Sequence, residues 1–175
     1  GGRLPGSVGI GTGVSIAIMD ESGTLLQPGE RGEVVIQGPN VIEGYENNPE
    51  ANASSFTTGW FRTGDEGVQN SEGYLTLLGR IKEIINRSGE KISPQEIDEV
   101  LLSHPAVAEA VAFGVPNSIH GEEPSAAVVL HSPLAPTELI RYCREHIADY
   151  KCPRVIHVVE EIPRTATGKI QRRMV

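Results

Sequence analysis

Asp65 is the first residue whose setting could support ligand chemistry. It directly follows Thr63 and Gly64. A carboxylate held by a glycine turn can accept two hydrogen bonds from a vicinal diol such as that of a ribose. The same three residues are also typical of an ordinary turn, in which the aspartate only accepts backbone hydrogen bonds. Taken alone, they favour the ordinary turn.

Lys169 ends a second segment of interest, Pro163-Arg164-Thr165-Ala166-Thr167-Gly168-Lys169. Its small and hydroxyl-bearing residues predict a mobile loop that can present one ammonium into a cleft, and Gly168 lets the backbone approach a ligand closely. The segment is not a Walker-type phosphate-binding loop, because the upstream glycine of that motif is absent and no helix start follows. A solvated basic loop is the alternative interpretation.

A charged block over residues 79–91 lies between two parts of the chain with different patterns. Its charged residues include Arg80, Lys82, Glu83, Arg87 and Lys91. Because burying charges without partners is too costly, we expect these side chains to face water, a cleft or an anionic ligand. Gly79 and Gly89 give the backbone freedom at either end. The block therefore predicts a junction between two units, residues 1–79 and 80–175.

The pattern of residues 1–79 predicts antiparallel β structure, a subdomain resembling a distorted barrel. Alternating apolar and polar residues between glycine-containing turns are typical of half-buried strands joined as hairpins. The expected strands are residues 14–19, 32–37 and 74–78, the last preceded by a turn at 70–73. A short helix is expected over residues 49–56, with Asn48 as its N-cap.

The pattern of residues 80–175 predicts a small α+β domain whose sheet is covered by helices. A helix should begin at Pro94, with Ser93 and Glu96 forming a capping box, and should end near Ser103 because Pro105 follows. Further elements are strands over residues 107–114, 124–131 and 155–159, and a helix over 138–147 with Leu139, Ile140, Cys143 and Ile147 inward. Cys143 is therefore expected to be a core residue rather than a nucleophile.

Composition and charge argue against several classes of binding protein. The 175-residue chain has a net charge of −8, whereas binding nucleic acid or an anionic membrane needs a cationic face. No apolar run approaches the roughly 20 residues of a membrane helix. The five histidines and two cysteines lack the spacing of metal ligands, so no metal site made of protein side chains alone is expected.

We expect a reducing, cytoplasmic location, because the two cysteines lack metal-ligand spacing and lie in a chain with no signal peptide. It begins at Gly1 without a start methionine, which suggests a piece of a longer protein. Its end, Arg173-Met174-Val175, is not a peroxisomal tripeptide. A peroxisomal location of the complete protein is left open.

Four motifs, in this order, resemble the adenylate-forming superfamily, which includes acyl-CoA synthetases, peptide-synthetase adenylation domains and luciferases. They are Thr63-Gly64-Asp65, Gly79 to Glu83, Ser88 to Lys91 and Thr165 to Ile170. Each is weak alone, but their order and spacing along the whole chain are specific. Within the superfamily, residues 44–52 and 84–94 most resemble the coumarate-CoA ligase-like branch, and plant and fungal oxalyl-CoA synthetases in particular.

This resemblance implies an ATP-dependent carboxylic acid–CoA ligase, with oxalate as one candidate acid. Its cofactors and substrates would be ATP, Mg²⁺ bound through ATP, coenzyme A and a small carboxylate. Asp65 and Arg80 would hold the ribose hydroxyls, Lys82 would be the hinge of a rotating small domain, and Lys169 would be the catalytic lysine of adenylation. Gly89 would lie beside the pantetheine tunnel and Lys91 near the nucleotide phosphates.

The resemblance also implies missing parts, since the family's phosphate loop, adenine-binding segment and acyl pocket all precede the position of Gly1. Residues 1–79 would be the end of the large adenylating domain and 80–175 the mobile domain. We expect the isolated chain to be inert and to need the rest of the large domain as a partner. Alternatives are a non-catalytic docking module, or part of another adenylate-forming enzyme such as a peptide-synthetase adenylation domain or a luciferase-like protein.

Overall fold

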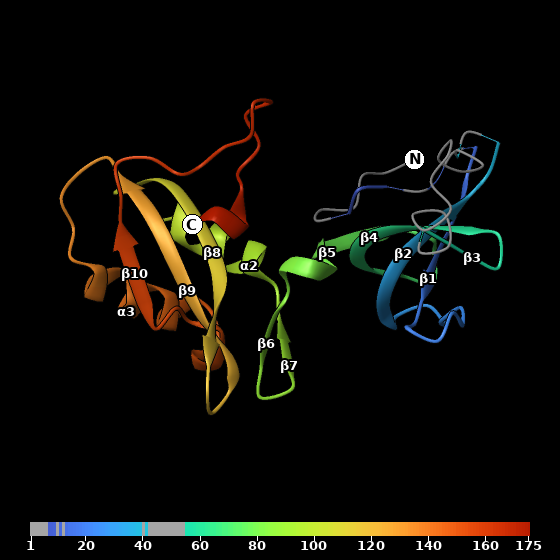
Figure 1. The fold of residues 1–175 in the computed structure, drawn as a ribbon, viewed down its shortest axis with the longest axis horizontal. Coiled ribbons are helices and arrows are strands. Elements are labelled where there is room, and N and C mark those ends of the chain that lie inside the picture. The colour runs from blue at the N-terminus through green and yellow to red at the C-terminus, as the bar shows by residue number, and fades with distance from the viewer. Residues whose placement is uncertain (1–6, 10, 12, 40, 42–54) are drawn as a thin grey trace. The chain divides into compact units, whose positions relative to one another are not determined.

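The computed structural model describes residues 7–9, 11, 13–39, 41 and 55–175 (Figure 1). Contacts between residues divide the chain into two compact units, Gly1–Lys82 and Glu83–Val175. Within the described residues, every helix is too short or too polar to span a lipid bilayer. The helix expected over residues 49–56 lies mostly outside the described residues, and Phe56 belongs to a strand.

The first unit is built around one curled antiparallel sheet (Figure 1). Its strands are β1 (Ser15–Met19), β2 (Arg31–Gln37), β3 (Phe56–Thr57), β4 (Trp60–Gln69) and β5 (Leu75–Arg80). β4 is the central strand, because it pairs with β2 and also with both β3 and β5. The strands expected over residues 14–19, 32–37 and 74–78 are confirmed, with bounds that differ by one or two residues.

Two features shape the hairpin formed by β4 and β5. The turn between β4 and β5 closes where the Asn70 amide donates to the Tyr74 carbonyl at 3.0 Å, as the glycine-containing turn predicted. The register between β4 and β5 shifts between Glu66 and Gly67. Such a bulge bends the strand and increases its twist, which contributes to the curl of the sheet. Ile18, Val34 and Leu75 pack together inside it.

The second unit contains a mixed sheet built around β9 (Figure 1). Its strands are β6 (Ile85–Arg87), β7 (Glu90–Ile92), β8 (Val107–Asn117), β9 (Gly121–Leu130) and β10 (Val155–Val158). β9 pairs antiparallel with β8 over their whole length and parallel with β10. The three expected strands are confirmed as β8, β9 and β10, whereas the hairpin β6–β7 was missed.

Helices α2 (Pro94–Leu102) and α3 (Pro136–His146) cover one face of this sheet. Alternate strand residues point to opposite faces, so Ala112 and Val128 pack with the buried helix residues Leu101 and Leu139. Val111, from the other face, packs with residues that include Ile162 of the segment after β10. The expected α+β domain with a sheet covered by helices is therefore confirmed.

The capping box expected at the start of α2 is wrong in its contacts. Ser93 is the N-cap residue, but its side chain makes no capping hydrogen bond. The Glu96 carboxylate instead binds Lys151, whose Nζ lies 2.8 Å from Glu96 Oε2. Glu96 therefore contacts a residue 55 positions away, and a local sequence motif cannot predict such a contact. The helix ends before Ser103, as Pro105 predicted.

Candidate functional site

Asp65 and Arg80 are brought together by the pairing of β4 with β5. They are partners in the antiparallel register, where facing side chains lie close enough to interact. Arg80 Nε lies 3.0 Å from Asp65 Oδ1, and Arg80 Nη1 donates to the Thr63 carbonyl at 3.0 Å. Both side chains keep solvent access, since Asp65 is 28% and Arg80 58% exposed. The pair therefore offers a carboxylate and a guanidinium to a ligand at one place.

Asp65 lies within a strand, so the turn expected at Thr63-Gly64-Asp65 is wrong. Gly64 has a φ of +74° in mid-strand, a conformation that favours glycine. The local backbone is held by side chains: Gly64 N–H donates to Glu33 Oε1 at 2.9 Å, and Asp65 N–H donates to Thr63 Oγ1 at 3.1 Å. Thr63 Oγ1 in turn donates to the Val34 carbonyl at 2.8 Å. This backbone is therefore fixed before any ligand binds.

Glu33 is a site-supporting residue that the sequence analysis missed. Its Oε1 binds Gly64 as above, and its Oε2 lies 2.6 Å from Arg62 Nη2. The side chain is 10% exposed. The signal that could have found it is a lone glutamate in the apolar strand β2, because a nearly buried carboxylate needs partners.

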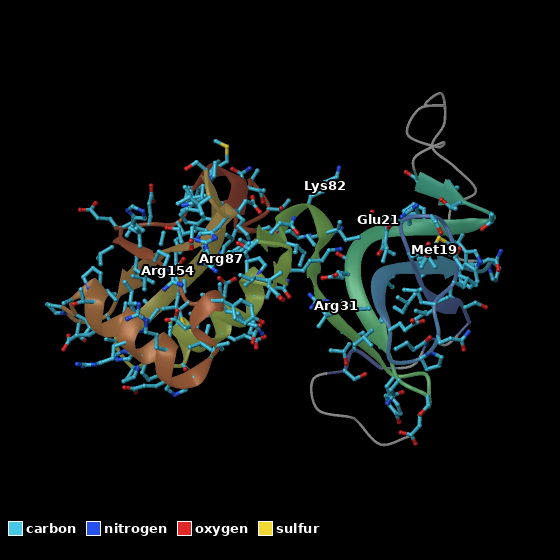
Figure 2. The ribbon with its side chains drawn as sticks, turned by 90° about the horizontal axis from the view of Figure 1, so that it is seen from below. Met19, Glu21, Arg31, Lys82, Arg87 and Arg154 are labelled. Atoms are coloured by element: carbon cyan, nitrogen blue, oxygen red, sulfur yellow. The ribbon has the colours of Figure 1, made fainter. Side chains whose placement is uncertain are left out.

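Lys82 lies at the boundary between the two units. It is exposed within a short 3₁₀ helix, η1 (Ile81–Glu83), and the first unit ends at Lys82 (Figure 2). A single 3₁₀ turn between two compact units is a natural place for backbone rotation. The hinge role of Lys82 stays a prediction.

Gly89 and Lys91 lie in the β6–β7 hairpin. Ser88 and Gly89 form its two-residue connection with φ values of +51° and +87°, the signature of a type I′ turn. Ser88 binds His120 twice, by backbone at 2.8 Å and through Oγ to Nδ1 at 2.7 Å. A Cβ added at Gly89 would meet no atom within 4 Å among the described residues. The glycine is therefore exposed at a fixed tip, and Lys91 is exposed on β7.

Arg87 does not face water, which corrects the expectation for this member of the charged block. Its Nε and Nη2 bind the two carboxylate oxygens of Glu123 at 3.0 and 3.1 Å, and both side chains are only 16% exposed. Arg154 approaches the same carboxylate at 3.5 Å, and Figure 2 labels it near Arg87. The hydrogen bonds from Arg87 lower the pKa of Glu123, with burial opposing them. The sequence pattern could not predict this burial because Glu123, the partner of Arg87, lies 36 residues away.

Lys169 lies at the end of a turn that backbone hydrogen bonds close, and the mobility predicted for this loop stays a prediction. Thr165 N–H donates to the Lys169 carbonyl and Gly168 N–H to the Thr165 carbonyl, each at 2.8 Å. Arg164 and Ile170 form a bridge at its base. The Lys169 side chain is exposed at the end of this turn. Local hydrogen bonds therefore fix the backbone while the ammonium stays accessible.

The cysteines take no part in these arrangements. Cys143 and Cys152 are free and fully buried, as expected for Cys143. Burial raises the pKa of the Cys143 thiol to about 12, and burial also raises that of Cys152. A thiol needs to become a thiolate to attack, so the packing removes both from the candidate nucleophiles.

Comparison with known proteins identifies much of the second unit. Residues 96–169, which end at Lys169, match the model of the AMP-binding enzyme C-terminal domain. These residues are similar to that domain. The match covers most of α2, the strands β8 and β9 and the Lys169 turn, but leaves out Asp65, Arg80 and the β6–β7 hairpin.

Relatives align over the whole chain. It is 53% identical to a probable CoA ligase, CCL9, of Humulus lupulus and 50% identical to the oxalate–CoA ligase of Arabidopsis thaliana. In both cases the alignment covers 100% of this chain and 34% of the relative. The chain therefore spans about a third of the length of these CoA ligases, in keeping with the resemblance inferred from the motifs.

A solved structure agrees with these relatives. The o-succinylbenzoate CoA synthetase of Bacillus subtilis, in complex with its acyl-adenylate intermediate, matches with a TM-score of 0.91 and 42% identity. The match covers 96% of this chain and 35% of that protein. The structures share a fold, and the relatives named here are all CoA ligases or synthetases.

Proposed function

We propose that this chain is part of an ATP-dependent carboxylic acid–CoA ligase with oxalate as its acid. The carboxylate attacks the α-phosphate of ATP to form an acyl-adenylate and release pyrophosphate. The thiol of coenzyme A then attacks the acyl carbon, forming a thioester and releasing AMP. The observation that carries the proposal is 50% identity, over the whole chain, to the oxalate–CoA ligases of Arabidopsis thaliana and Saccharomyces cerevisiae.

Asp65 and Arg80 are proposed to bind the ribose of the nucleotide. A carboxylate offers about four lone-pair sites, so Asp65 can accept from a diol while Oδ1 also receives Arg80 at 3.0 Å. Arg80 has further N–H groups for hydroxyl or phosphate oxygens. The fixed backbone around Gly64 supports this role, because a preorganised site loses less entropy when the nucleotide binds.

Lys169 is proposed to act in adenylation. Its compact ammonium can bind the attacking carboxylate and the phosphate oxygens while negative charge develops on them. The closed turn beneath it supports the proposal, since a fixed donor needs little rearrangement during the reaction. Mg²⁺ would arrive with the phosphates of ATP as part of the substrate.

The second half-reaction is proposed to use the other candidate residues. Rotation at Lys82 would replace one face of the mobile unit with another at the nucleotide. Gly89, on the exposed tip of the β6–β7 hairpin, would allow the pantetheine arm of coenzyme A to pass close to the backbone. Lys91 would supply positive charge near the nucleotide phosphates. The remainder of a large adenylating domain is the partner that this scheme requires.

The test uses the full-length enzyme, meaning the complete protein that contains this chain. Pyrophosphate exchange should depend on oxalate, and CoA thioester should form with it more efficiently than with 2-succinylbenzoate or sulfoacetate, the acids named for other relatives. A preference for another carboxylate would reject oxalate but keep the ligase. Absence of exchange with every acid would reject the ligase and favour a docking module.

A variant of Asp65 tests the nucleotide site separately. Asp65→Ala should raise the KM for ATP about tenfold or more, because hydrogen bonds to a charged group contribute roughly 1.5–3 kcal/mol each. It should also abolish the preference for ATP over 2′-deoxy-ATP or 3′-deoxy-ATP. Glu72→Ala, at an exposed carboxylate in the β4–β5 turn, is the matched control. Retained ribose discrimination in Asp65→Ala would contradict the assignment.

A further inference from the structure

Arg172 joins the chain end that carries Lys169 to three other elements of the second unit. It begins the 3₁₀ helix η3 (Arg172–Met174), three residues after Lys169. Its side chain is 11% exposed. It contacts Glu83 in η1, Asp98 in α2 and the Ala112 carbonyl in β8. One nearly buried side chain therefore connects segments separated by as many as 89 residues.

The contacts use the planar shape of the guanidinium. Nη2 and Nη1 bind the two Asp98 oxygens at 2.8 and 3.2 Å, while Nε binds Glu83 Oε2 at 3.0 Å. Asp98 Oδ1 also accepts from the Ala112 amide at 2.6 Å. Only a rigid fork of five donors can bind these groups at once, and a lysine cannot reproduce this geometry.

Such a buried ionic cluster is costly to form. Desolvation offsets much of the attraction between buried charges, so a buried pair adds little net stability compared with apolar packing. Burial raises the pKa of Asp98 although Arg172 opposes the effect. We therefore interpret the cluster as holding the segments that it joins in one defined arrangement. The contacts of Arg172 identify those segments.

The Lys169 turn is attached on both sides to β8. On the entering side, Arg164 Nη2 binds Glu109 of β8 at 2.6 Å. On the leaving side, Gln171 N–H donates to the Pro163 carbonyl at 2.9 Å and Arg172 then binds the Ala112 carbonyl. Arg172 also binds Glu83, the first residue of the second unit and the neighbour of Lys82.

We propose that Arg172 is a positioning residue that joins the Lys169 turn and the end of the hinge into one rigid body. The inference rests on the proposed function. When the backbone rotates at Lys82, the bond between Arg172 and Glu83 makes the second unit move as one body, beginning at its first residue. The bonds from Arg172 to Asp98 and Ala112 make the Lys169 turn move with that body. Arg172 contacts no reacting atom in this scheme.

The first experiment substitutes Arg172 in the full-length enzyme. Arg172→Met should lower the kcat of adenylation about 10-fold to 100-fold, the effect of displacing a reacting group by roughly 1 Å, with little change in the KM for ATP. Compared with Arg172→Met, Arg172→Lys should recover more of the lost folding than of the lost adenylation. Arg141→Met, at a 72% exposed arginine on α3, is the control for charge removal and should match the unchanged enzyme.

The second experiment distinguishes positioning from folding. Glu83→Ala removes the hinge-side contact and leaves the Asp98 pair in place, so it tests the proposal even if Arg172→Met does not fold. We expect it to change the ratio of the adenylation and thioester rates severalfold at an unchanged folded fraction, measured by circular dichroism. An unchanged ratio in folded Glu83→Ala overturns the proposal, and so does normal adenylation by folded Arg172→Met.

The same assays separate this inference from the proposed function. Lys169→Ala is measured alongside. If it leaves adenylation intact, the catalytic assignment fails and the positioning role fails with it. If Lys169→Ala is defective while folded Arg172→Met and Glu83→Ala adenylate normally, only the positioning inference fails.

Discussion

At the scale of single residues, Lys169 combines a fixed backbone with an exposed ammonium. The turn from Thr165 to Lys169 is closed by backbone hydrogen bonds of 2.8 Å. Lys169→Ala in the full-length enzyme should slow adenylation on the order of 10²-fold to 10³-fold, by analogy with removing one preorganised donor. Pyrophosphate exchange measures this step directly.

The control for Lys169→Ala is the second half-reaction. Domain rotation is proposed to carry the turn away from the reacting atoms, so the variant should convert supplied acyl-adenylate and coenzyme A to thioester at a near-normal rate. Its unfolding free energy should change by about 0.5 kcal/mol or less, as at an exposed site. Normal adenylation would favour the alternative of a solvated basic loop.

Motifs in the sequence identified candidate site residues, but they could not show which contacts hold those residues in place. Thr63-Gly64-Asp65 and Arg80 were recognised as motifs, and pairing in the sheet then placed Asp65 opposite Arg80. Glu33 was missed because its partners lie 29 and 31 residues away, and Arg172 because its partners lie 60 to 89 residues away. Local patterns carry no information about such contacts. The roles of the recognised residues stay predictions.

At the scale of elements, an ion pair joins the β6–β7 hairpin to β9. Arg87 ends β6 and binds Glu123 of β9, at a place where only Arg87 and Gly121 pair between the strands. Glu123→Gln should therefore destabilise the second unit by about 1–3 kcal/mol at pH 7, because it weakens hydrogen bonds to a charged group. Urea unfolding of the isolated chain measures the change.

The same ion pair predicts the direction of a pH effect. The folded-state pKa of Glu123 lies below its ordinary value of 4.5, so its contribution is present above pH 4.5. This contribution is lost as pH falls through the lower, folded value. Glu123→Gln should flatten this part of the acid unfolding curve, whereas Glu145→Gln, at an exposed residue on α3, should not. An equally steep curve for Glu123→Gln would contradict the assignment.

The hinge at Lys82 allows a test by backbone restraint. Proline fixes φ near −65° and removes an amide donor, whereas two domain arrangements need different dihedral angles at the hinge. Lys82→Pro in the full-length enzyme should therefore keep adenylation and lose thioester formation. Lys82→Ala controls for loss of the ammonium. Equal loss of both half-reactions in Lys82→Pro would indicate a structural residue.

Elements with strong local signals were the ones predicted correctly. Proline at the first helical position and an apolar face identified α2, whereas α3 was identified by its apolar face alone. Alternating or continuous apolar runs identified β8 and β9. The β6–β7 hairpin was missed because its strands have three residues each and are rich in charge. Its Ser88-Gly89 connection is also an unusual form of the Asn-Gly signal for a type I′ turn.

At the scale of the whole molecule, the chain is expected to depend on a larger protein for catalysis. It spans about a third of the length of its CoA ligase relatives. The isolated chain should show no carboxylate-dependent pyrophosphate exchange, and should bind ATP in the millimolar range or more weakly, about −4 kcal/mol. Isothermal titration and an exchange assay check both points. Measurable exchange by the purified chain would refute this dependence.

The two units should also differ in stability, because each has its own apolar core. Among the described residues, the main cluster of the second unit joins two helices and five strands, whereas that of the first unit consists of Ile18, Val34 and Leu75 with two partly buried neighbours. The free energy of unfolding is a small difference between hydrophobic burial and conformational entropy, so a unit that buries less apolar surface is expected to be less stable. We expect urea to unfold the first unit before the second.

Amide hydrogen exchange of the isolated chain can resolve this order strand by strand. Protection should be greatest in β8 and β9, whose long pairing lies between two buried faces, and lower in β1 and β2. Residues 83–175 produced alone should keep the same protection pattern in β8 and β9, because their core residues all lie within that range. A single transition with uniform protection would instead show that the two units fold as one cooperative body.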